Sequence, residues 1–161
     1  MPDPVDSPNT YIRPAVEDDA FYLAERLRQA DLDELKASSN HSPLEALLTG
    51  FHSSTRCFTG VHNKVPFIIF GACPVVEDVG CVWGLGSDDI HKARMGFLRL
   101  SNEGVEELQK DFPLLFNYVD KRNELHIRWL KWMKFKFINL HQDFGVGRLP
   151  FYEFVRITDH V

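Results

Sequence analysis

The chain has 161 residues, of which 44% are hydrophobic and 13 are Phe. A chain of this length and apolar content buries about 70% of its unfolded surface in one domain, which excludes wholesale disorder. Its formal net charge of −5 argues against nucleic acid as the main partner, and no apolar run approaches the roughly 20 residues of a membrane span, so we expect no membrane association.

The first half of the chain predicts an arm, a strand and two helices. Residues 1–9 hold three of the nine Pro residues and are expected to form a flexible arm, whereas residues 10–161 form a single domain. A short strand at 10–14 ends at Pro14, which lacks an amide donor. Apolar residues spaced three and four apart between 20 and 30 predict a helix, and a second helix begins at Ser42, where Pro43 and Glu45 complete a capping box.

The second half predicts eight more elements before the end of the chain. Strands at 56–61 and 65–73 flank a turn at 62–64, and a Gly-rich strand at 80–86 follows. Apolar residues at helical spacing predict a long helix from about residue 91 to 110, followed by an interior strand at 112–119 and a helix from Asn123. Two closing strands are expected at 136–140 and 151–157. The predicted order is β-α-α-β-β-β-α-β-α-β-β.

The three cysteines, Cys57, Cys73 and Cys81, all lie in apolar, strand-like runs. Their odd number and positions favour reduced, buried thiols over a disulfide framework. The seven His residues are scattered without the close spacing of metal ligands, so no metal site is expected.

The helix from Asn123 carries a partial motif. The element order and this helix resemble the GNAT-type N-acyltransferases, in which Asn follows a strand and a helix N-x-x-A-x-x-x-Y-x-K-x-G-F packs beside acyl-coenzyme A. Asn123 and Phe135 match its first and last positions, whereas His126 replaces the Ala, Leu130 the Tyr general acid and Lys134 the Gly. The resemblance implies an α+β fold with a mixed, mostly antiparallel sheet of about seven strands, splayed between strands four and five, and about four helices.

The resemblance also implies a phosphate site at the start of the helix after the fourth strand. There, main-chain amides in a Q/R-x-x-G-x-G/A loop hold the diphosphate of the cofactor. The segment from Gly84 lacks that spacing, and Asp88 and Asp89 are expected to occupy the same amides and to repel phosphate. We therefore expect no cofactor. If acetyl-coenzyme A does bind, its site residues are Leu85, Gly86, Ser87, Lys92, Arg94 and Asn123.

No catalytic residue can be assigned from the sequence. His91, His126, Glu77 and Asp78 are candidate bases, and Cys73 is a candidate nucleophile. Each has an ordinary structural alternative, namely a half-buried His, a polar hairpin turn or an inert thiol.

Four runs within residues 10–157, at 82–90, 97–99, 114–123 and 127–130, are similar to a family of small tailed-phage proteins that includes internal virion proteins of short-tailed phages. This resemblance implies a virion or assembly-associated protein, in the virion or the host cytoplasm, that uses a noncatalytic GNAT-like scaffold to dock other virion proteins or a host protein. The alternative is a GNAT-type N-acetyltransferase that uses acetyl-coenzyme A on a protein or small-molecule amine.

The last helix and its approaches predict a contact surface, the basic strip of Lys121, Arg122, Arg128, Lys131 and Lys134. This strip suits an acidic partner, and its alternative reading is an ordinary solvated helix face. Trp129 and Trp132 lie three residues apart on the same helix, so one side of it is apolar, and an exposed Trp there would anchor an interface.

Overall fold

The computed structural model describes residues 9–158, so the arm predicted over residues 1–9 lies outside the described residues except for its last position. Over these residues the chain forms seven strands and five helices. The strands are β1 (Thr10–Pro14), β2 (Arg56–His62), β3 (Val65–Val76), β4 (Val79–Gly86), β5 (Leu114–Asp120), β6 (Lys136–Phe144) and β7 (Leu149–Ile157). The helices are α1 (Glu17–Ala24), α2 (Gln29–Ser38), α3 (Pro43–Ser53), α4 (Ile90–Gln109) and α5 (Glu124–Trp132).

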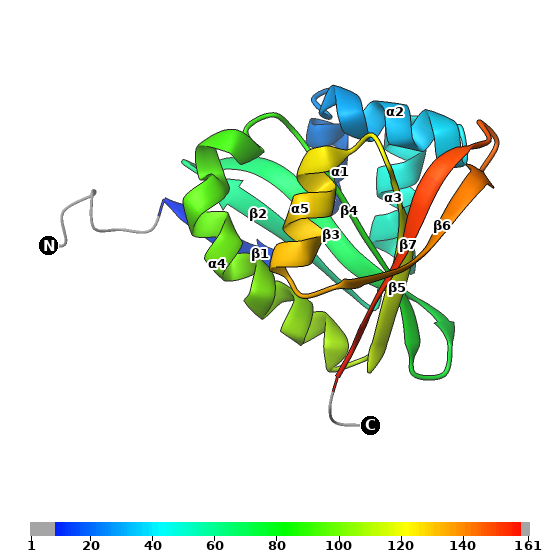
Figure 1. Ribbon diagram of the computed structural model, residues 1–161. Coiled ribbons are helices and arrows are strands. Elements are labelled where there is room, and N and C mark those ends of the chain that lie inside the picture. Colours follow the sequence, from blue (N-terminus) through cyan, green and yellow to red (C-terminus); the bar gives the residue numbers. More distant parts are fainter. Residues whose placement is uncertain (1–8, 159–161) are drawn as a thin grey trace, which may run out of the picture.

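All seven strands lie in one sheet with the order β1-β2-β3-β4-β5-β7-β6. The β4–β5 pair is parallel and the other five pairs are antiparallel. Helices α4 and α5 cover one face of the sheet and α1, α2 and α3 cover the other (Figure 1). The predicted α+β class and the mixed, mostly antiparallel sheet are therefore confirmed.

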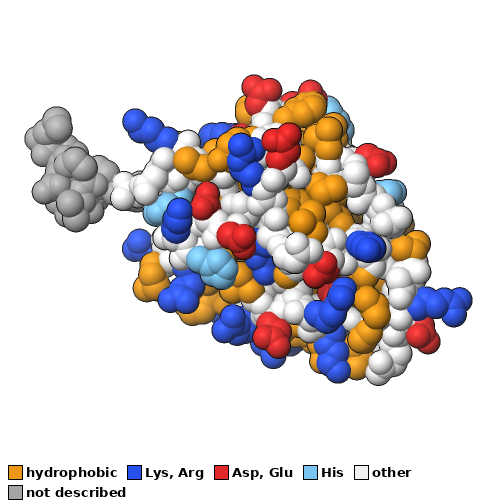
Figure 2. Space-filling model, turned by 90° about the horizontal axis from the view of Figure 1, so that it is seen from above, with side chains coloured by type: hydrophobic (Ala, Val, Ile, Leu, Met, Phe, Trp, Pro, Cys, Tyr) orange, Lys and Arg blue, Asp and Glu red, His pale blue; other side chains and the backbone are white. Residues whose placement is uncertain are grey.

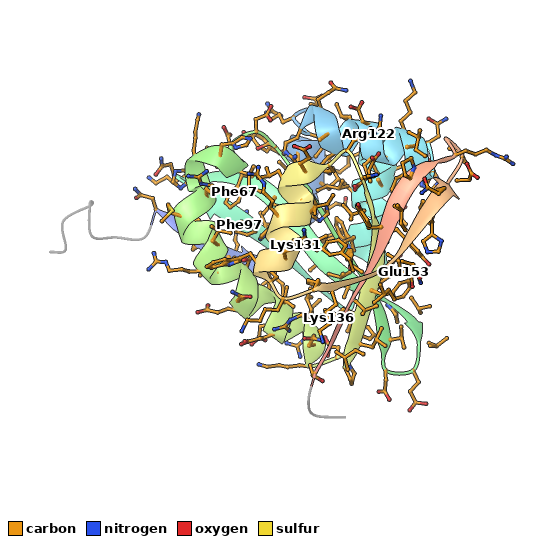
Figure 3. The ribbon with its side chains drawn as sticks, in the orientation of Figure 1. Phe67, Phe97, Arg122, Lys131, Lys136 and Glu153 are labelled. Carbon is orange, nitrogen blue, oxygen red and sulfur yellow. The ribbon has the colours of Figure 1, made fainter. Side chains whose placement is uncertain are left out.

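The larger core lies between the sheet and helices α4 and α5. Phe67 on β3 and Phe97 on α4 are both fully buried, with their ring centroids 5.1 Å apart and their planes at 89° (Figure 3). A smaller core on the other face joins Leu23, Leu47 and Ile69. Burial of each such side chain contributes about 2 kcal/mol, which fixes the helices against both faces.

The sequence predicted one helix where the structure has two. Helix α1 ends at Ala24, and α2, which was not predicted, begins at Gln29. Between them the main-chain N–H of Arg28 donates to the Gly86 carbonyl oxygen at 2.9 Å, and Leu27 forms a bridge with Ser87. Because this segment pairs with the end of β4, its backbone cannot stay helical, and apolar spacing alone does not reveal the pairing.

The predicted local signals at α3 and the β2–β3 turn are confirmed. The Ser42 hydroxyl oxygen accepts a bond from the Glu45 N–H at 3.2 Å, and the Glu45 carboxylate accepts from the Ser42 N–H at 3.4 Å.

The three cysteines are free and half-buried, and burial raises the pKa of Cys57 to about 12 and that of Cys81 to about 11. None of the helices described over residues 9–158 is long and apolar enough to cross a membrane.

Candidate functional site

Strands β4 and β5 separate after a short parallel pairing. They pair only from Val79 with Leu114 to Cys81 with Phe116, although β4 continues to Gly86 and β5 to Asp120. Where they part, the Asn117 side-chain amide donates to the Val82 carbonyl oxygen at 2.6 Å. The sheet therefore has a gap between the carboxyl ends of these two strands, as the predicted splay required.

A cavity of about 420 Å³ occupies this gap and reaches both faces of the sheet. Its α2 half is lined by Glu34, Leu35, Trp83, Tyr118, Phe144 and Phe151, and its α5 half by Val105, His126, Trp129, Leu130 and Met133. Seen from the end at which the strands diverge, apolar side chains form a strip bordered by charged ones (Figure 2). A cavity that joins both faces lets two ligands meet inside the sheet, one from each side.

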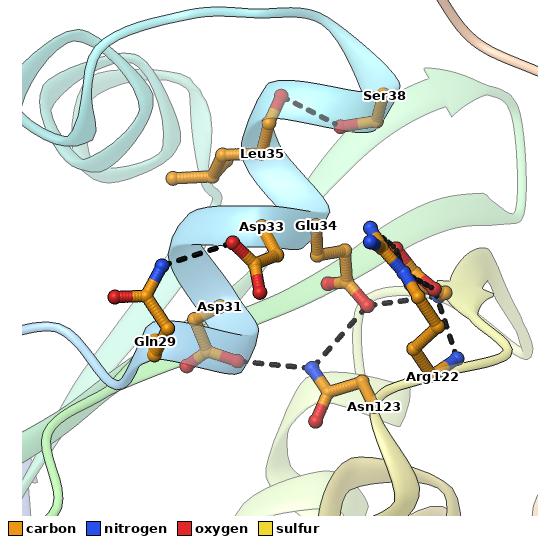
Figure 4. A network of polar contacts seen from close by, with 9 residues as sticks. Gln29, Asp31, Asp33, Glu34, Leu35, Ser38, Arg122 and Asn123 are labelled. Atoms are coloured by element: carbon orange, nitrogen blue, oxygen red, sulfur yellow. Dashed lines mark hydrogen bonds and ion pairs between the residues drawn. The ribbon is translucent and has the colours of Figure 1, made fainter. Parts of the chain in front are cut away.

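Glu34 brings a carboxyl group from α2 to the cavity. One of its oxygens accepts from the Asp120 main-chain N–H at 2.9 Å and from the Asn123 side-chain amide at 3.4 Å (Figure 4). Burial, together with the negative charge of Asp31, raises the pKa of Glu34 to about 8. The group therefore exchanges a proton close to neutral pH.

A buried polar network fixes the mouth of the gap. The Arg28 guanidinium donates to Asp31 at 3.0 Å and to the Asn123 side-chain oxygen at 3.1 Å, and Asn123 donates back to Asp31 at 3.0 Å. Asp31 also accepts from the Gly86 N–H at 3.0 Å. These bonds tie α2, the end of β4 and the start of α5 together. Because the buried groups are mutually satisfied, the network stabilises one arrangement of the gap.

The α5 half carries an unused hydrogen-bond donor. Among the buried side-chain polar atoms in the described part of the chain, the Trp129 indole nitrogen alone has no partner. The Trp129 ring is held 4.6 Å, centroid to centroid, from Phe97. His126 lies beside it with a pKa lowered by burial, so that the imidazole is neutral at pH 7. A buried orphan donor is costly, and a ligand acceptor in the cavity would satisfy it.

The structure separates the six residues predicted for a cofactor into two sets. Leu85, Gly86 and Ser87 are buried at the end of β4, and Asn123 is 1% exposed within the polar network. Gly86 and Asn123 are linked through Asp31. Lys92 and Arg94 are instead exposed on the first two turns of α4. The cofactor contacts of all six residues stay predictions.

The expected capping of α4 by Asp88 and Asp89 is wrong. The N–H groups of Ile90, His91 and Lys92 donate to main-chain carbonyl oxygens of Ser87, Asp88 and Asp89 at 3.0 to 3.2 Å. Asp89 already has helical backbone angles, and its carboxylate lies 3.4 Å from the Lys92 ammonium. A capping residue needs an extended backbone to turn its side chain onto the amides, and Asp89 lacks one.

Most of the other predicted catalytic groups lie outside the cavity. Glu77 and Asp78 form the exposed β3–β4 turn, at the opposite end of β4 from the gap, and His91 is exposed on α4. Cys73 and His126 do line the cavity, and the Cys73 sulfur lies 3.5 Å from the Ser54 hydroxyl. Glu34, Tyr118 and Asn117 were not predicted. No sequence signal marks them, because only the pairing of the strands and the packing of α2 on β5 bring them to one gap.

The basic strip is exposed along α5 and its approaches (Figure 3). Arg122 pairs with Asp120 at 2.7 Å, whereas the other four members form no ion pair with any described residue. Trp132 is 50% exposed, and its indole N–H donates to the Leu98 carbonyl oxygen at 2.8 Å. The binding of an acidic partner to this strip stays a prediction.

No protein-family model and no curated protein sequence matches the chain. Solved structures do. The structure of yncA from Salmonella typhimurium, described as an acetyltransferase with its cofactor acetyl-CoA, has a TM-score of 0.74 at 12% identity over 95% of this chain and 96% of its own. Ribosomal-protein-alanine N-acetyltransferase from Brucella melitensis has a TM-score of 0.71 at 15% identity over 92% and 99%. Spermidine N-acetyltransferase from Vibrio cholerae, in complex with CoA and spermine, has a TM-score of 0.66 at 10% identity over 94% and 96%.

These likenesses show that the chain has the GNAT fold, with its seven-stranded mixed sheet and five helices. They also correct the function predicted from the phage resemblance. The similar structures are acetyltransferases, two of them holding CoA or acetyl-CoA, and nothing in them points to a virion or assembly protein. The noncatalytic virion reading is therefore contradicted, and its alternative is the better supported.

Proposed function

We propose that this protein is an N-acetyltransferase that moves an acetyl group from acetyl-CoA to a primary amine. The observation that carries the proposal is the cavity through the β4–β5 gap, because it joins the two faces of the sheet. An acyl donor on the α5 side and an amine on the α2 side would meet inside it. The fold alone does not decide the activity, since one scaffold serves many functions.

The α5 half fits the thioester end of such a donor. The Trp129 indole N–H lacks an acceptor and belongs to a residue that lines the cavity, so a carbonyl oxygen of the donor would supply one. The backbone of β4 offers a second hydrogen-bonding site for the donor. The N–H of Ser87 donates to Phe67 on β3, whereas the N–H and C=O of Gly86 point away from β3, toward the gap. By strand alternation the N–H and C=O of Gly84 point into the gap as well, where they can pair with the amides of an extended arm.

The diphosphate end fits less closely. Lys92 and Arg94 are the cations near the start of α4 that would hold it, with Asp88 exposed beside them. Between the start of α4 and the gap, side chains including Ile90, Leu125 and Trp129 leave a space of only about 10 Å³. Binding therefore requires the starts of α4 and α5 to move apart, at the place where the polar network holds α5 to α2.

The chemistry assigns a role to Glu34. The bound thioester supplies an acyl carbon with a thiolate as leaving group. The Glu34 carboxylate accepts the proton that the amine nitrogen loses as its bond to that carbon forms and the carbon–sulfur bond breaks. A base with a pKa of about 8 is well matched to this transfer near neutral pH. Burial and the charge of Glu153 raise the pKa of Tyr118, so its phenol stays protonated and available as a donor in the same cavity.

The missing phenol at position 130 is compatible with this reaction. Leu130 is 2% exposed and lines the cavity in place of the Tyr of the motif. A thiol has a pKa of about 8.5, so its thiolate leaves without a strong acid beside it. Replacement of that Tyr therefore slows the reaction without preventing it.

The test combines binding and turnover. We expect acetyl-CoA at about 100 times its dissociation constant to raise the free energy of unfolding by about 2.7 kcal/mol, which is visible as a shift in Tm. With an amine present, thiol release should be measurable with a thiol-reactive dye. Glu34→Gln should bind acetyl-CoA as the wild type does and lose turnover. The absence of both a Tm shift and acetylated product would overturn the proposal.

A further inference from the structure

We infer that the amine acceptor is a small monoamine with a flat, ring-sized apolar substituent and no carboxylate. This inference rests on the proposed N-acetyltransferase function and concerns the α2 half of the same cavity. It follows from the walls and the charges of that half and from the space that the acyl group leaves free.

The walls of the α2 half are aromatic and held in place. The ring of Tyr118 lies 4.5 Å, centroid to centroid, from that of Phe144, which in turn lies 4.7 Å from Phe151. On the other side the Trp83 indole donates to the Ser54 hydroxyl at 2.8 Å. Trp83 also packs flat on α3, where a Cβ at Gly50 would lie 2.5 Å from its ring. Rigid aromatic walls of this kind favour a flat apolar group between them.

The charges allow one positive group and no negative one. Among the described residues that line the whole cavity, Glu34 is the single carboxylate, and there is no Lys or Arg. The two neighbouring acids are each paired with an Arg, Asp31 with Arg28 at 3.0 Å and Asp120 with Arg122 at 2.7 Å. A second ammonium of a polyamine would therefore be desolvated without a partner, and so would the carboxylate of an amino acid.

The volume sets the size of the acceptor. The cavity holds about 420 Å³ in total, and this space is shared with the acyl group on the α5 side. The remainder suits one ring and a short alkyl linker, with the amine directed toward Glu34. A folded protein segment or an aminoglycoside is too large and carries too many polar groups for an apolar pocket of this size.

Direct binding tests the inference independently of acetyl transfer. We expect isothermal titration of 2-phenylethylamine to give at least 10-fold tighter binding than titration of phenylalanine, which adds a carboxylate, or of spermidine, which adds two amines. Phe144→Ala should weaken 2-phenylethylamine binding about 10-fold. The matched control Phe21→Ala, which removes a ring 48% exposed on α1, should not change it. Phe144→Leu, with Tm measured, distinguishes loss of the wall from loss of the fold.

The outcomes separate this inference from the proposed function. If acetyl-CoA binds and spermidine or phenylalanine is bound or acetylated as well as 2-phenylethylamine, the acceptor inference is wrong and the transferase proposal stands. If 2-phenylethylamine binds selectively but no acetylated product forms, the pocket is correctly assigned and the transferase proposal fails. Equal, weak binding of all three amines would also overturn the inference.

Discussion

Asn123 donates a side-chain hydrogen bond to Asp31 across 3.0 Å, and this contact joins residues 92 positions apart in the sequence. Asp31 is 3% exposed and Asn123 is 1% exposed, so the bond is made away from water. It fixes the start of α5 against α2 at the mouth of the gap. Buried bonds of this kind contribute most through what their loss leaves unpaired.

Asn123→Asp is expected to destabilise the protein by about 2 to 4 kcal/mol at pH 8, because it replaces an amide donor by a third carboxyl group beside Asp31 and Glu34. The loss should shrink as the pH falls to 5, where one carboxyl takes up a proton. Urea unfolding at both pH values measures it. Gln142→Glu, on the exposed edge strand β6, is the control and should change the free energy of unfolding by less than about 0.5 kcal/mol.

The raised pKa of Glu34 predicts how stability depends on pH. Its pKa is about 8 in the folded protein against 4.5 for the free side chain, so the folded state binds more protons than the unfolded state between these values. The free energy of unfolding should therefore fall as pH rises from about 5 to 8, by on the order of 3 kcal/mol. Glu34→Gln should flatten this slope. An identical slope in the variant would contradict the assignment.

The sequence predicted the elements better than it predicted the site. Local apolar periodicity predicts the strands and the long helix α4, and the capping residue Ser42 predicts the start of α3. These elements were therefore predicted correctly without knowledge of tertiary contacts. The positions of Arg28 and Glu34 could not be predicted in this way. Arg28 is not helical because its main chain pairs with Gly86, and Glu34 reaches the gap because α2 packs over the divergent end of β5. The capping of α4 by Asp88 and Asp89 was predicted from their charge, and charge does not reveal the backbone angles that capping requires.

Asn117 should control the width of the gap. Its amide donates to the Val82 carbonyl oxygen at 2.6 Å where β4 and β5 part, so Asn117→Ala removes the last bond between the two strands. We expect a loss of about 1 kcal/mol and faster amide hydrogen exchange in β4 and β5, with exchange in β1 and β2 unchanged. Asn139→Ala is the matched control. Unchanged exchange at Val82 to Gly84 would show that the bond does not hold the strands.

The exposed acids at the start of α4 should oppose a diphosphate. Because the carboxylates of Asp88 and Asp89 do not accept bonds from the helix amides, the double change to Asn should alter the free energy of unfolding by less than about 0.5 kcal/mol. The affinity for acetyl-CoA should rise a few-fold at low salt and converge with that of the wild type at high salt. Glu103→Gln, exposed farther along α4, is the control for net charge. A cofactor affinity unaffected by the double change would place the diphosphate elsewhere.

The two tryptophans of α5 provide a paired test of the cofactor side. Trp129→Phe removes an indole N–H that has no partner, which offsets part of the packing lost against Phe97, so the free energy of unfolding should fall by less than about 1 kcal/mol, whereas acetyl-CoA should bind about fivefold more weakly. Trp132→Phe removes an N–H that donates to the Leu98 carbonyl oxygen, so stability should fall by about 1 kcal/mol while the affinity is kept. Urea unfolding and calorimetric titration measure both quantities. If Trp129→Phe binds acetyl-CoA as tightly as the wild type, the orphan donor does not serve the cofactor, and the α5 half of the cavity loses its assigned ligand.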